Sequence, residues 1–247
     1  IDAKLYCDLY WNIAHSAGLE CNIISGIAKD IYGNMDNKEH QWISVLTDND
    51  TILLDPTWGI GRVVNDELIL SKDHLLWFDT DPYWFAFSHS PNDSNDMYIN
   101  QTIDLQIFDM LPPLSPDCQY LGWDPCSLLQ QCLQQEIKHT PYIFSIDKDK
   151  TLEVVKTPML RVISTDSTYT FEIKNPQNHI FGIRLNNHWY PAEEWEKNGD
   201  IYSIQITPEQ DGILSLRIQD TNGQDISLIQ YLVANPEDQE DIDELQG

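Results

Sequence analysis

A predicted hairpin between residues 39 and 59 constrains the fold of this chain more than any other stretch. Its first half reads Glu-His-Gln-Trp-Ile-Ser-Val-Leu-Thr, its second half reads Thr-Ile-Leu-Leu-Asp-Pro-Thr-Trp-Gly, and the polar turn Asp48-Asn49-Asp50 separates them. Two apolar runs rich in β-branched residues on either side of a short Asp/Asn turn are typical of a β-hairpin. Since the strands of a hairpin are antiparallel, the start of the first and the end of the second lie at the same end.

His40 begins the first strand of this hairpin, and Asp55 ends the second. The alternation of side chains along a strand predicts that both lie on one face, so we expect the imidazole beside the carboxylate. A carboxylate that keeps one ring nitrogen protonated leaves the other free to accept a proton, which is the arrangement of an oriented general base. Two simpler interpretations stay open, because a histidine at a strand start is often exposed and an Asp before Pro is often a turn residue.

Four blocks of the first half occur in a recognisable order. They are His40-x-Trp42, Leu54-Asp55-Pro56-Thr57-Trp58-Gly59, Phe78-Asp79-Thr80-Asp81-Pro82 and Ser88-His89-Ser90-Pro91-Asn92-Asp93. Together they resemble the transglutaminase-like superfamily, and most of all its kyphoscoliosis-peptidase-type branch. The resemblance implies a Cys-His-Asp cysteine protease, amidase or acyl transferase acting on a protein or peptide. It implies that His40 and Asp55 are catalytic, that His89 borders the cleft, and that Trp42 and Trp58 are candidate site residues.

The position of the nucleophile departs from the family pattern. In that family a cysteine begins the first helix, within a pattern G-V-C-x-G-Y-A, and the helix ends in A-G-I/L-E. Residues 16–20 (Ser-Ala-Gly-Leu-Glu) fit that end, and counting back places Ala3 where the cysteine belongs, with Ile1 and Leu5 in place of the two glycines. Without sulfur no thioester can form, so the resemblance implies a pseudoenzyme.

Three explanations of Ala3 stay open. The loss can be natural, which the absence of both glycines favours, or Ala3 can be an engineered replacement of cysteine. In the third, the register is shifted and Cys7 is the nucleophile, although it lies about one helical turn further along. The simpler interpretation of Cys7 is a buried structural thiol.

The charge of the chain limits its partners. Lys and Arg number 14 against 40 Asp and Glu, which gives a formal net charge of −26. Nucleic acids and anionic membrane surfaces repel such a chain, so we expect neither as a partner, whereas a basic partner or Ca²⁺ is compatible with the charge. No apolar run approaches the roughly 20 residues that cross a bilayer, so we expect no membrane span.

The cysteines predict neither a disulfide framework nor a metal site. They number five, at Cys7, Cys21, Cys118, Cys126 and Cys132. An odd number scattered through a long chain is not a disulfide pattern, and the last three lack the spacing of metal ligands. We expect no metal and no cofactor. The chain begins at Ile1 rather than Met, so we expect a processed or trimmed piece whose export signal would be out of view. An extracellular or periplasmic location is favoured.

The first half predicts an α+β papain- or transglutaminase-like core over residues 1–114. Leu5, Leu9, Ile13 and Ala17 have helical spacing, which predicts an amphipathic or largely buried helix ended by Gly18. A strand over 21–28 and the hairpin follow, and a Pro-rich stretch at 111–114 marks the boundary. A linker helix region is predicted over 115–140, with Asp124 as N-cap before Pro125.

The second half predicts an all-β sandwich of immunoglobulin type over residues 141–235. Short alternating runs are separated by Asn, Asp and Gly turns, which is the pattern of antiparallel strands. The runs are 142–146, 152–155, 160–164, 169–173, 181–185, 201–206, 213–218 and 226–234. The remaining residues, 236–247, predict an acidic disordered tail.

Two functions follow from these observations. In one, the chain is an active transglutaminase-like cysteine enzyme in which His40 acts as base and Asp55 orients it. In the other, which the missing sulfur at Ala3 favours, the chain keeps this arrangement without catalysis. It then binds protein or glycan through the cleft or the β-sandwich.

Overall fold

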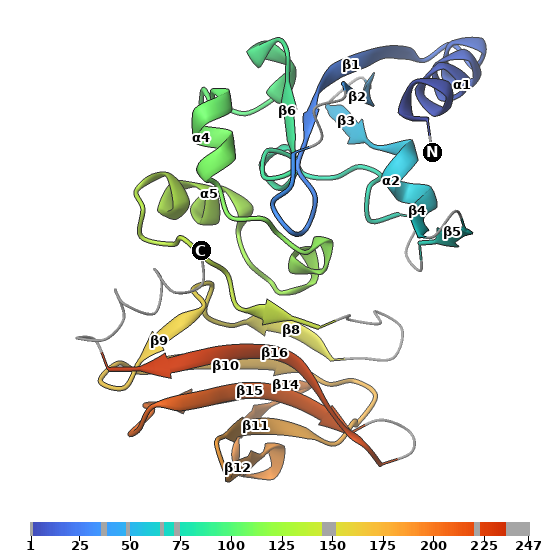
Figure 1. The fold of residues 1–247 in the computed structure, drawn as a ribbon. Helices are drawn as coiled ribbons and strands as arrows, with labels where there is room; N and C mark the ends of the chain where they lie inside the picture. The colour runs from blue at the N-terminus through green and yellow to red at the C-terminus, as the bar shows by residue number, and fades with distance from the viewer. Residues whose placement is uncertain are drawn as a thin grey trace. The chain divides into compact units, whose positions relative to one another are not determined.

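The computed structural model describes residues 2–35, 39–47, 50–64, 67–71, 75–144, 152–219 and 223–235 (Figure 1). The chain divides into two compact units, Ile1–Leu114 and Ser115–Gly247. The linker helix region predicted over 115–140 falls within the second unit. The acidic tail predicted over 236–247 lies outside the described residues, as do turn positions 48 and 49 of the hairpin.

Unit 1 combines one long helix with short strands and short helices. In chain order its elements are α1 (Ala3–Ser16), β1 (Glu20–Ala28), β2 (His40–Leu46), β3 (Thr51–Leu54), α2 (Pro56–Ile60), β4 (Gly61–Val64), β5 (Glu67–Leu70), α3 (Pro82–Phe85), β6 (His89–Pro91), the 3-10 helix η1 (Ser94–Met97) and α4 (Leu105–Met110). Asp2 starts α1, because its side chain accepts hydrogen bonds from the backbone N–H groups of Lys4 and Leu5.

An antiparallel sheet is the centre of unit 1. Its strands lie in the order β3-β2-β1-β6, and β4 and β5 form a separate two-stranded ribbon. The predicted hairpin is present as β2 and β3, with Ile43 opposite Leu54. Asp55 follows β3 directly, so it comes to the end of the hairpin at which His40 begins β2.

The central sheet is buried on both faces. The face that packs against α1 belongs to a core cluster of Cys7, Ala14, Cys21, Ile43, Val45 and Leu54. The opposite face belongs to a second cluster, which contains Ile24, Trp42, Leu53, Trp77 and Phe85. Because successive residues of a strand point to opposite faces, Trp42 and Ile43 pack in different core clusters.

The buried side of α1 differs from the predicted one. The residues expected to face inward are exposed, by 64% for Leu5, 56% for Leu9 and 63% for Ile13. The residues that pack on the sheet instead are Cys7, Tyr10, Trp11 and Ala14, which also have helical spacing. The Trp11 Nε1–H donates a 2.8 Å hydrogen bond to the carbonyl of Cys21 in β1, which fixes this orientation.

The rest of unit 1 consists of short helices separated by irregular chain. Asp81 caps α3 and Asp104 caps α4, each through its side chain. The buried Lys29, which follows β1, donates Nζ hydrogen bonds of 2.5 Å to the carbonyl of Phe108 and 2.7 Å to that of Leu111. These carbonyls lie at the end of α4, where a cation interacts favourably with the helix dipole.

Unit 2 begins with helices and continues as short strands. Its elements are the 3-10 helix η2 (Pro116–Tyr120), α5 (Pro125–Leu133), β7 (Tyr142–Ile143), β8 (Glu153–Lys156), β9 (Val162–Ser164), β10 (Tyr169–Lys174), β11 (Phe181–Leu185), β12 (His188–Pro191), the 3-10 helix η3 (Ala192–Glu194), β13 (Glu196–Asn198), β14 (Ile201–Ile206), β15 (Gly212–Gln219) and β16 (Asp225–Ala234). The N-cap predicted at Asp124 is present, since its side chain accepts a hydrogen bond from the Ser127 N–H.

Two sheets form most of unit 2. One has the strand order β13-β14-β10-β8, and the other has β12-β11-β15-β16-β7 with β9 pairing beside β16. The β9–β16 pair is parallel, whereas the other pairs are antiparallel. Phe171 of β10 and Tyr231 of β16 meet with ring centroids 5.8 Å apart, so the two sheets share a core.

The predicted fold class, an α+β papain- or transglutaminase-like core followed by an immunoglobulin-like sandwich, is wrong. The structure is mostly β, with 39% strand against 24% helix. Among the described residues the helices are few and, apart from α1, have at most nine residues. In unit 1 the described helices after α1 are short, with four residues in α3 and six in α4, which are too few to form a helical layer.

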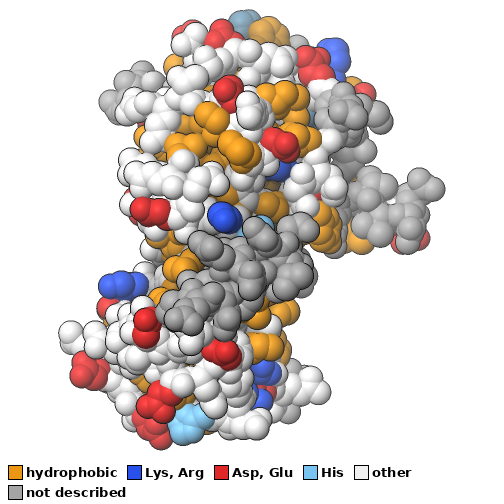
Figure 2. Space-filling model, turned by 60° about the vertical axis from the view of Figure 1, so that its left-hand side comes forward, with side chains coloured by type: hydrophobic (Ala, Val, Ile, Leu, Met, Phe, Trp, Pro, Cys, Tyr) orange, Lys and Arg blue, Asp and Glu red, His pale blue; other side chains and the backbone are white. Residues whose placement is uncertain are grey.

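The helices and the cysteines agree with the expectations of no membrane-spanning helix and no disulfide framework. No helix in the described part of the chain is long and apolar enough to span a membrane. All five cysteines are free thiols. The face drawn in Figure 2 shows apolar side chains at the surface among acidic ones.

Candidate functional site

The central sheet brings His40 and His89 to one face. Gly26 of β1 lies opposite His40 of β2, and the residue two positions later in β1 lies opposite His89 of β6. A Cβ at Gly26 would lie 2.2 Å from the carbonyl oxygen of Ser90 and 2.7 Å from the ring of Trp42. The glycine therefore lets β6 and the indole approach closely, and the two imidazole centroids come within 5.6 Å.

Asp55 is fixed by the turn that leads from β3 into α2. It is the N-cap of α2, and its Oδ1 accepts hydrogen bonds from the N–H groups of Thr57 at 2.8 Å and Trp58 at 3.0 Å. Pro56 at the first helical position favours the extended conformation of Asp55. The carboxylate is fully buried, with 0% of the residue exposed.

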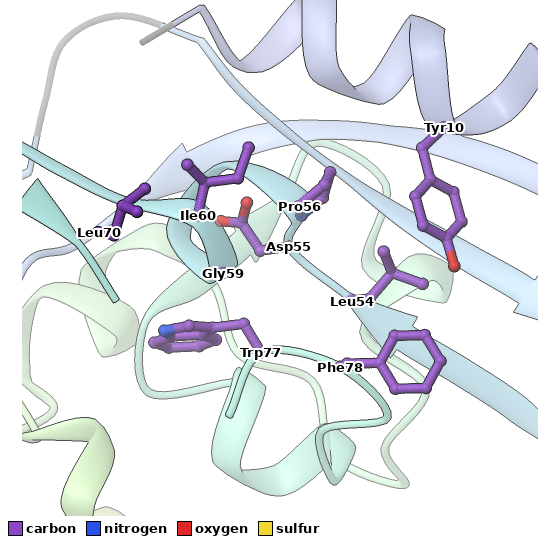
Figure 3. A pocket seen from close by; sticks show the side chains of 9 residues that line it. All are labelled: Tyr10, Leu54, Asp55, Pro56, Gly59, Ile60, Leu70, Trp77 and Phe78. Atoms are coloured by element: carbon purple, nitrogen blue, oxygen red, sulfur yellow. The ribbon is translucent and has the colours of Figure 1, made fainter. Parts of the chain in front are cut away.

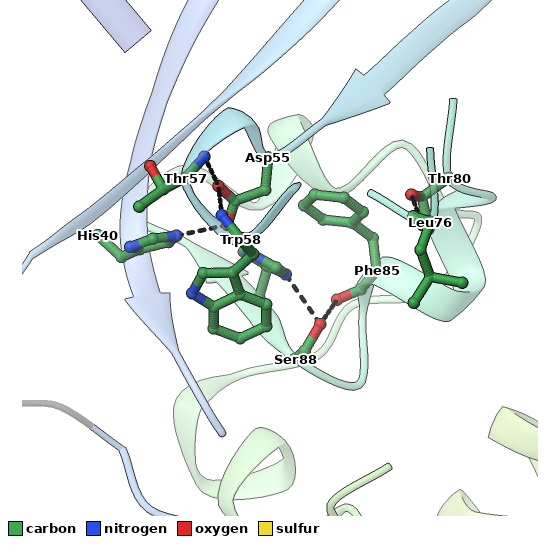
Figure 4. A network of polar contacts seen from close by, with 9 residues as sticks. His40, Asp55, Thr57, Trp58, Leu76, Thr80, Phe85 and Ser88 are labelled. Carbon is green, nitrogen blue, oxygen red and sulfur yellow. Dashed lines mark hydrogen bonds and ion pairs between the residues drawn. The ribbon is translucent and has the colours of Figure 1, made fainter. Parts of the chain in front are cut away.

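The second carboxylate oxygen of Asp55 contacts both imidazoles. Oδ2 lies 2.7 Å from His40 Nε2 and 3.2 Å from His89 Nε2. Figure 4 shows the carboxylate between the ring of His40 and the start of α2. One oxygen of Asp55 therefore begins the helix while the other holds two ring nitrogens.

Ser88 holds the other nitrogen of His89. Its Oγ lies 2.8 Å from His89 Nδ1 and donates a 3.3 Å hydrogen bond to the carbonyl of Phe85 (Figure 4). A hydroxyl can donate or accept, so Ser88 is compatible with either tautomer of His89.

Aromatic rings surround the cluster on the sides away from Asp55. The centroid of His89 lies 4.1 Å from that of Phe85, 4.7 Å from Trp58 and 5.0 Å from Trp42. The His89 side chain is 1% exposed, whereas that of His40 is 14% exposed. His40 is therefore the member of the cluster that reaches solvent.

Burial and charge shift the pKa values of Asp55 and His89. Burial alone would raise the pKa of Asp55, but hydrogen bonds from His40 and His89 and their charges outweigh it, so the pKa is lowered. Burial lowers the pKa of His89 to about 4, against the opposing effect of Asp55. His89 is therefore neutral and Asp55 ionised at neutral pH.

The structure separates Cys7 from the histidines. Cys7 is 0% exposed and packs with Ile43 on the α1 face of the sheet, whereas His40 lies on the other face. Burial raises the pKa of the Cys7 thiol to about 12, and the charge of Asp55 adds to this effect. Ala3 is the first residue of α1 and carries a methyl group at the expected nucleophile position.

An apolar pocket of about 310 Å³ adjoins the cluster. Its walls come from α1, the β3–α2 turn, β5 and the segment before α3, and the lining residues are Tyr10, Leu54, Asp55, Pro56, Gly59, Ile60, Leu70, Trp77 and Phe78. Figure 3 shows Tyr10 and Phe78 at one end and Ile60 and Leu70 at the other. The pocket and the cluster share Asp55, and the ring of Trp77 lies 5.5 Å from that of His89.

Sequence reasoning singled out His40, Asp55, Trp42, Trp58 and His89, and the structure brings these five together. It missed two further contributors. Ser88 could have been found as the polar neighbour of His89 in the sequence. Gly26 gives no local signal, because its importance depends on the pairing of β1 with β6, which is distant along the chain.

Comparison with known proteins adds no assignment. No protein-family model matches the chain, and no curated protein sequence matches it.

Proposed function

We propose that unit 1 is a non-catalytic binding domain that takes an apolar side chain of a protein or peptide into the pocket beside Asp55. The observation that carries the proposal is the burial of the Cys7 thiol. Cys7 is fully buried on the far face of the sheet, with its pKa raised by burial to about 12. A thiol in that state supplies no thiolate for attack, and Ala3 supplies no sulfur.

The lining of the pocket supports an apolar ligand group. Aliphatic and aromatic side chains make most of the wall, and the oxygens of Asp55 are already bonded to Thr57, Trp58 and the two imidazoles. A glycan needs many polar partners, which this wall does not offer, whereas one apolar side chain needs few. The charge of −26 favours a neutral or basic partner over an acidic one.

The alternative is an active cysteine enzyme of the kind that the sequence blocks resemble. The contact between His40 and Asp55 favours it, since a carboxylate-bound imidazole is the arrangement of a general base. Thiol labelling separates the two functions. Iodoacetamide at neutral pH, followed by mass mapping, should label the half-buried Cys126 of α5 and leave Cys7 unmodified.

Rapid labelling of Cys7 that disappears in His40→Ala would contradict the proposal and favour the enzyme. An Ala3→Cys variant extends the test. If the restored thiol reacts faster than Cys126, His40 acts on that position and only the sulfur is missing. If it reacts no faster, the imidazole does not serve a nucleophile there.

Binding itself is tested by NMR titration with N-acetyl-leucinamide, with N-acetyl-serinamide and N-acetylglucosamine as polar comparisons. We expect the leucine amide alone to shift the amide signals of Gly59 and Ile60. A Leu70→Asp change, which puts a charge in the wall, should abolish these shifts, while Leu68→Asp on the same exposed strand should not. Equal shifts from all three compounds, or shifts unaffected by Leu70→Asp, would count against the pocket.

A further inference from the structure

We propose that His40, Asp55 and His89 form a binding site for a divalent transition-metal ion, with Zn²⁺ the best match. Among the described residues these three offer ligand atoms that all lie within 4.8 Å of one another. This inference does not depend on the apolar ligand proposed above, although the pocket and the metal site share Asp55.

The donor set suits such an ion. Two imidazole nitrogens and one carboxylate oxygen are ligands that zinc and its neighbours in the transition series prefer, whereas Ca²⁺ and Mg²⁺ prefer oxygen alone. Tetrahedral ligands at roughly 2.0–2.1 Å from zinc lie about 3.3 Å from one another. The distance of 3.2 Å from Asp55 Oδ2 to His89 Nε2 is already close to that value, whereas Oδ2 and His40 Nε2, now 2.7 Å apart, must separate slightly to admit the ion.

Two of the three ligands, His89 and Asp55, have the partners that a metal site needs. A histidine that binds metal through one nitrogen usually donates its other N–H to an oxygen, which fixes the tautomer. For His89 that oxygen is Ser88 Oγ, 2.8 Å from Nδ1, and Ser88 can donate in turn to the carbonyl of Phe85. Metal binding through Nε2 requires the proton that His89 shares with Asp55 to be on Nδ1 instead, where Ser88 Oγ can accept it.

The carboxylate is also held in place without the metal. Oδ1 of Asp55 keeps its hydrogen bonds to the backbone of Thr57 and Trp58, so Oδ2 alone turns to the imidazoles. The site is buried among aromatic rings, where an ionised carboxylate gains most from a nearby positive charge.

Access to the site from solvent lies on the side of His40. Its side chain is 14% exposed, whereas those of His89 and Asp55 are 1% and 0% exposed. Three protein ligands leave a fourth position of a tetrahedral ion for water or another small ligand. An ion or a small ligand therefore reaches the site most directly past His40, the most exposed of the three residues.

The test uses the full chain after treatment with EDTA and exhaustive dialysis. Titration with ZnCl₂ in a calorimeter, and against a chromophoric chelator, should give one ion per chain. CoCl₂ should give a visible absorption band of a tetrahedral nitrogen and oxygen site. We expect His40→Ala and His89→Ala each to weaken Zn²⁺ binding by roughly 100-fold or more, because changes outside the ligand set alone cost about 10- to 100-fold.

Matched variants make the result specific. His15→Ala and His188→Ala remove exposed histidines elsewhere, and Cys126→Ser removes the half-buried thiol, so none should alter the affinity. Ser88→Ala should weaken binding by about 10-fold while leaving one site. If circular dichroism shows that His89→Ala does not fold, the test relies on His40→Ala and His40→Gln, since His40 is the more exposed of the two histidines.

Two results would overturn the proposal. One is the absence of Zn²⁺ uptake by the native chain under these conditions. The other is uptake that persists at native affinity in both His40→Ala and His40→Gln.

Discussion

The two faces of the central sheet in unit 1 bury opposite kinds of chemistry. On the α1 face a thiol, Cys7, lies among aliphatic side chains and is kept protonated by burial. On the other face a carboxylate, Asp55, lies among aromatic rings and stays ionised because two imidazoles bind it. Successive residues of a strand point to opposite faces. A shift of one residue in the register of a strand would therefore exchange the side chains that it contributes to the two faces.

The difference between the faces lies in what accompanies each burial. Desolvation raises the pKa of both groups, yet only Asp55 has partners that reverse the effect. With its polar partners, the buried Asp55 stays charged. Without such partners, the buried Cys7 stays a protonated, unreactive thiol. The sheet therefore separates the histidine–aspartate cluster from the buried thiol of Cys7.

Removing the Asp55 carboxylate should have the largest effect on stability. Asp55→Ala takes away the N-cap of α2 and the acceptor of both imidazoles, so we expect a loss of about 4 kcal/mol in the free energy of unfolding, measured in urea. The control is Asp104→Ala, which removes only an exposed cap of α4 and should cost about 1 kcal/mol. Equal losses would mean that the imidazoles add nothing to the capping role.

Filling the space at Gly26 should have the next largest effect. In Gly26→Ala the new methyl meets the backbone of Ser90 and the ring of Trp42, and backbone cannot move aside cheaply, so we expect a loss of about 3 kcal/mol. Gly18→Ala meets no atom within 4 Å and bears only the strain of a left-handed conformation, about 1 kcal/mol. Thermal and urea unfolding of the two variants should rank them in this order.

Acid should destabilise the imidazole face selectively. His89 has its pKa lowered to about 4 in the folded chain, against 6.5 when unfolded. The unfolded chain therefore binds the proton first, and stability present above pH 6.5 falls by roughly 2–3 kcal/mol as the pH drops toward 4. Asp55, whose pKa is also lowered, adds a loss in the same direction at still lower pH. In chelator-treated His89→Gln the free energy of unfolding should fall less steeply between pH 6.5 and 4. An unchanged slope would contradict the assignment of this pH dependence to His89.

A polar substitution on the α1 face should destabilise the folded chain. Cys7→Ser puts a hydroxyl among aliphatic neighbours, and we expect a loss of about 2 kcal/mol, because a buried hydroxyl without a partner bears its full desolvation cost. Cys126→Ser, at a half-buried position of α5, should change stability by less than about 0.5 kcal/mol. If Cys7→Ser is equally mild, the α1 face is more hydrated than its burial indicates.

The smallest effect concerns Thr57, next to the Asp55 carboxylate. Its Oγ1 is buried and has no hydrogen-bond partner among the described residues, so Thr57→Val should raise the free energy of unfolding by up to about 1 kcal/mol. Thr80→Val offers the matched case, because Thr80 Oγ1 donates to the carbonyl of Leu76 and its loss should cost about 1 kcal/mol. The two changes should have opposite signs in parallel urea titrations; a loss in both would show that Thr57 has a partner in solution.

Local patterns predicted the elements of this chain better than their packing. Strands β11 and β14 have the predicted bounds, and the hairpin of β2 and β3 is present. β12 and β13 were not predicted, because they are short and mostly polar or aromatic. The predicted fold class failed because it rested on the order of one helix, one strand and a hairpin at the start of the chain, which does not determine how much helix follows.

The orientation of α1 shows why periodicity is insufficient. Two stripes of apolar residues share this helix, one containing Leu9 and the other containing Trp11. Periodicity favours the more aliphatic stripe, but the hydrogen bond from Trp11 to β1 and the small side chains of Cys7 and Ala14 suit the sheet better. The pairing of His40 with Asp55 followed from the hairpin alone, whereas the position of His89 required the long-range pairing of β1 with β6.

The double use of Asp55 has a consequence for the history of such a chain. Because one side chain starts a helix and anchors two rings, drift cannot discard it without also damaging the folded domain. Selection for folding alone would therefore preserve a histidine–aspartate arrangement long after any turnover had ceased. In this chain the demands of folding are therefore enough to account for these residues, and their presence is not by itself a sign of activity.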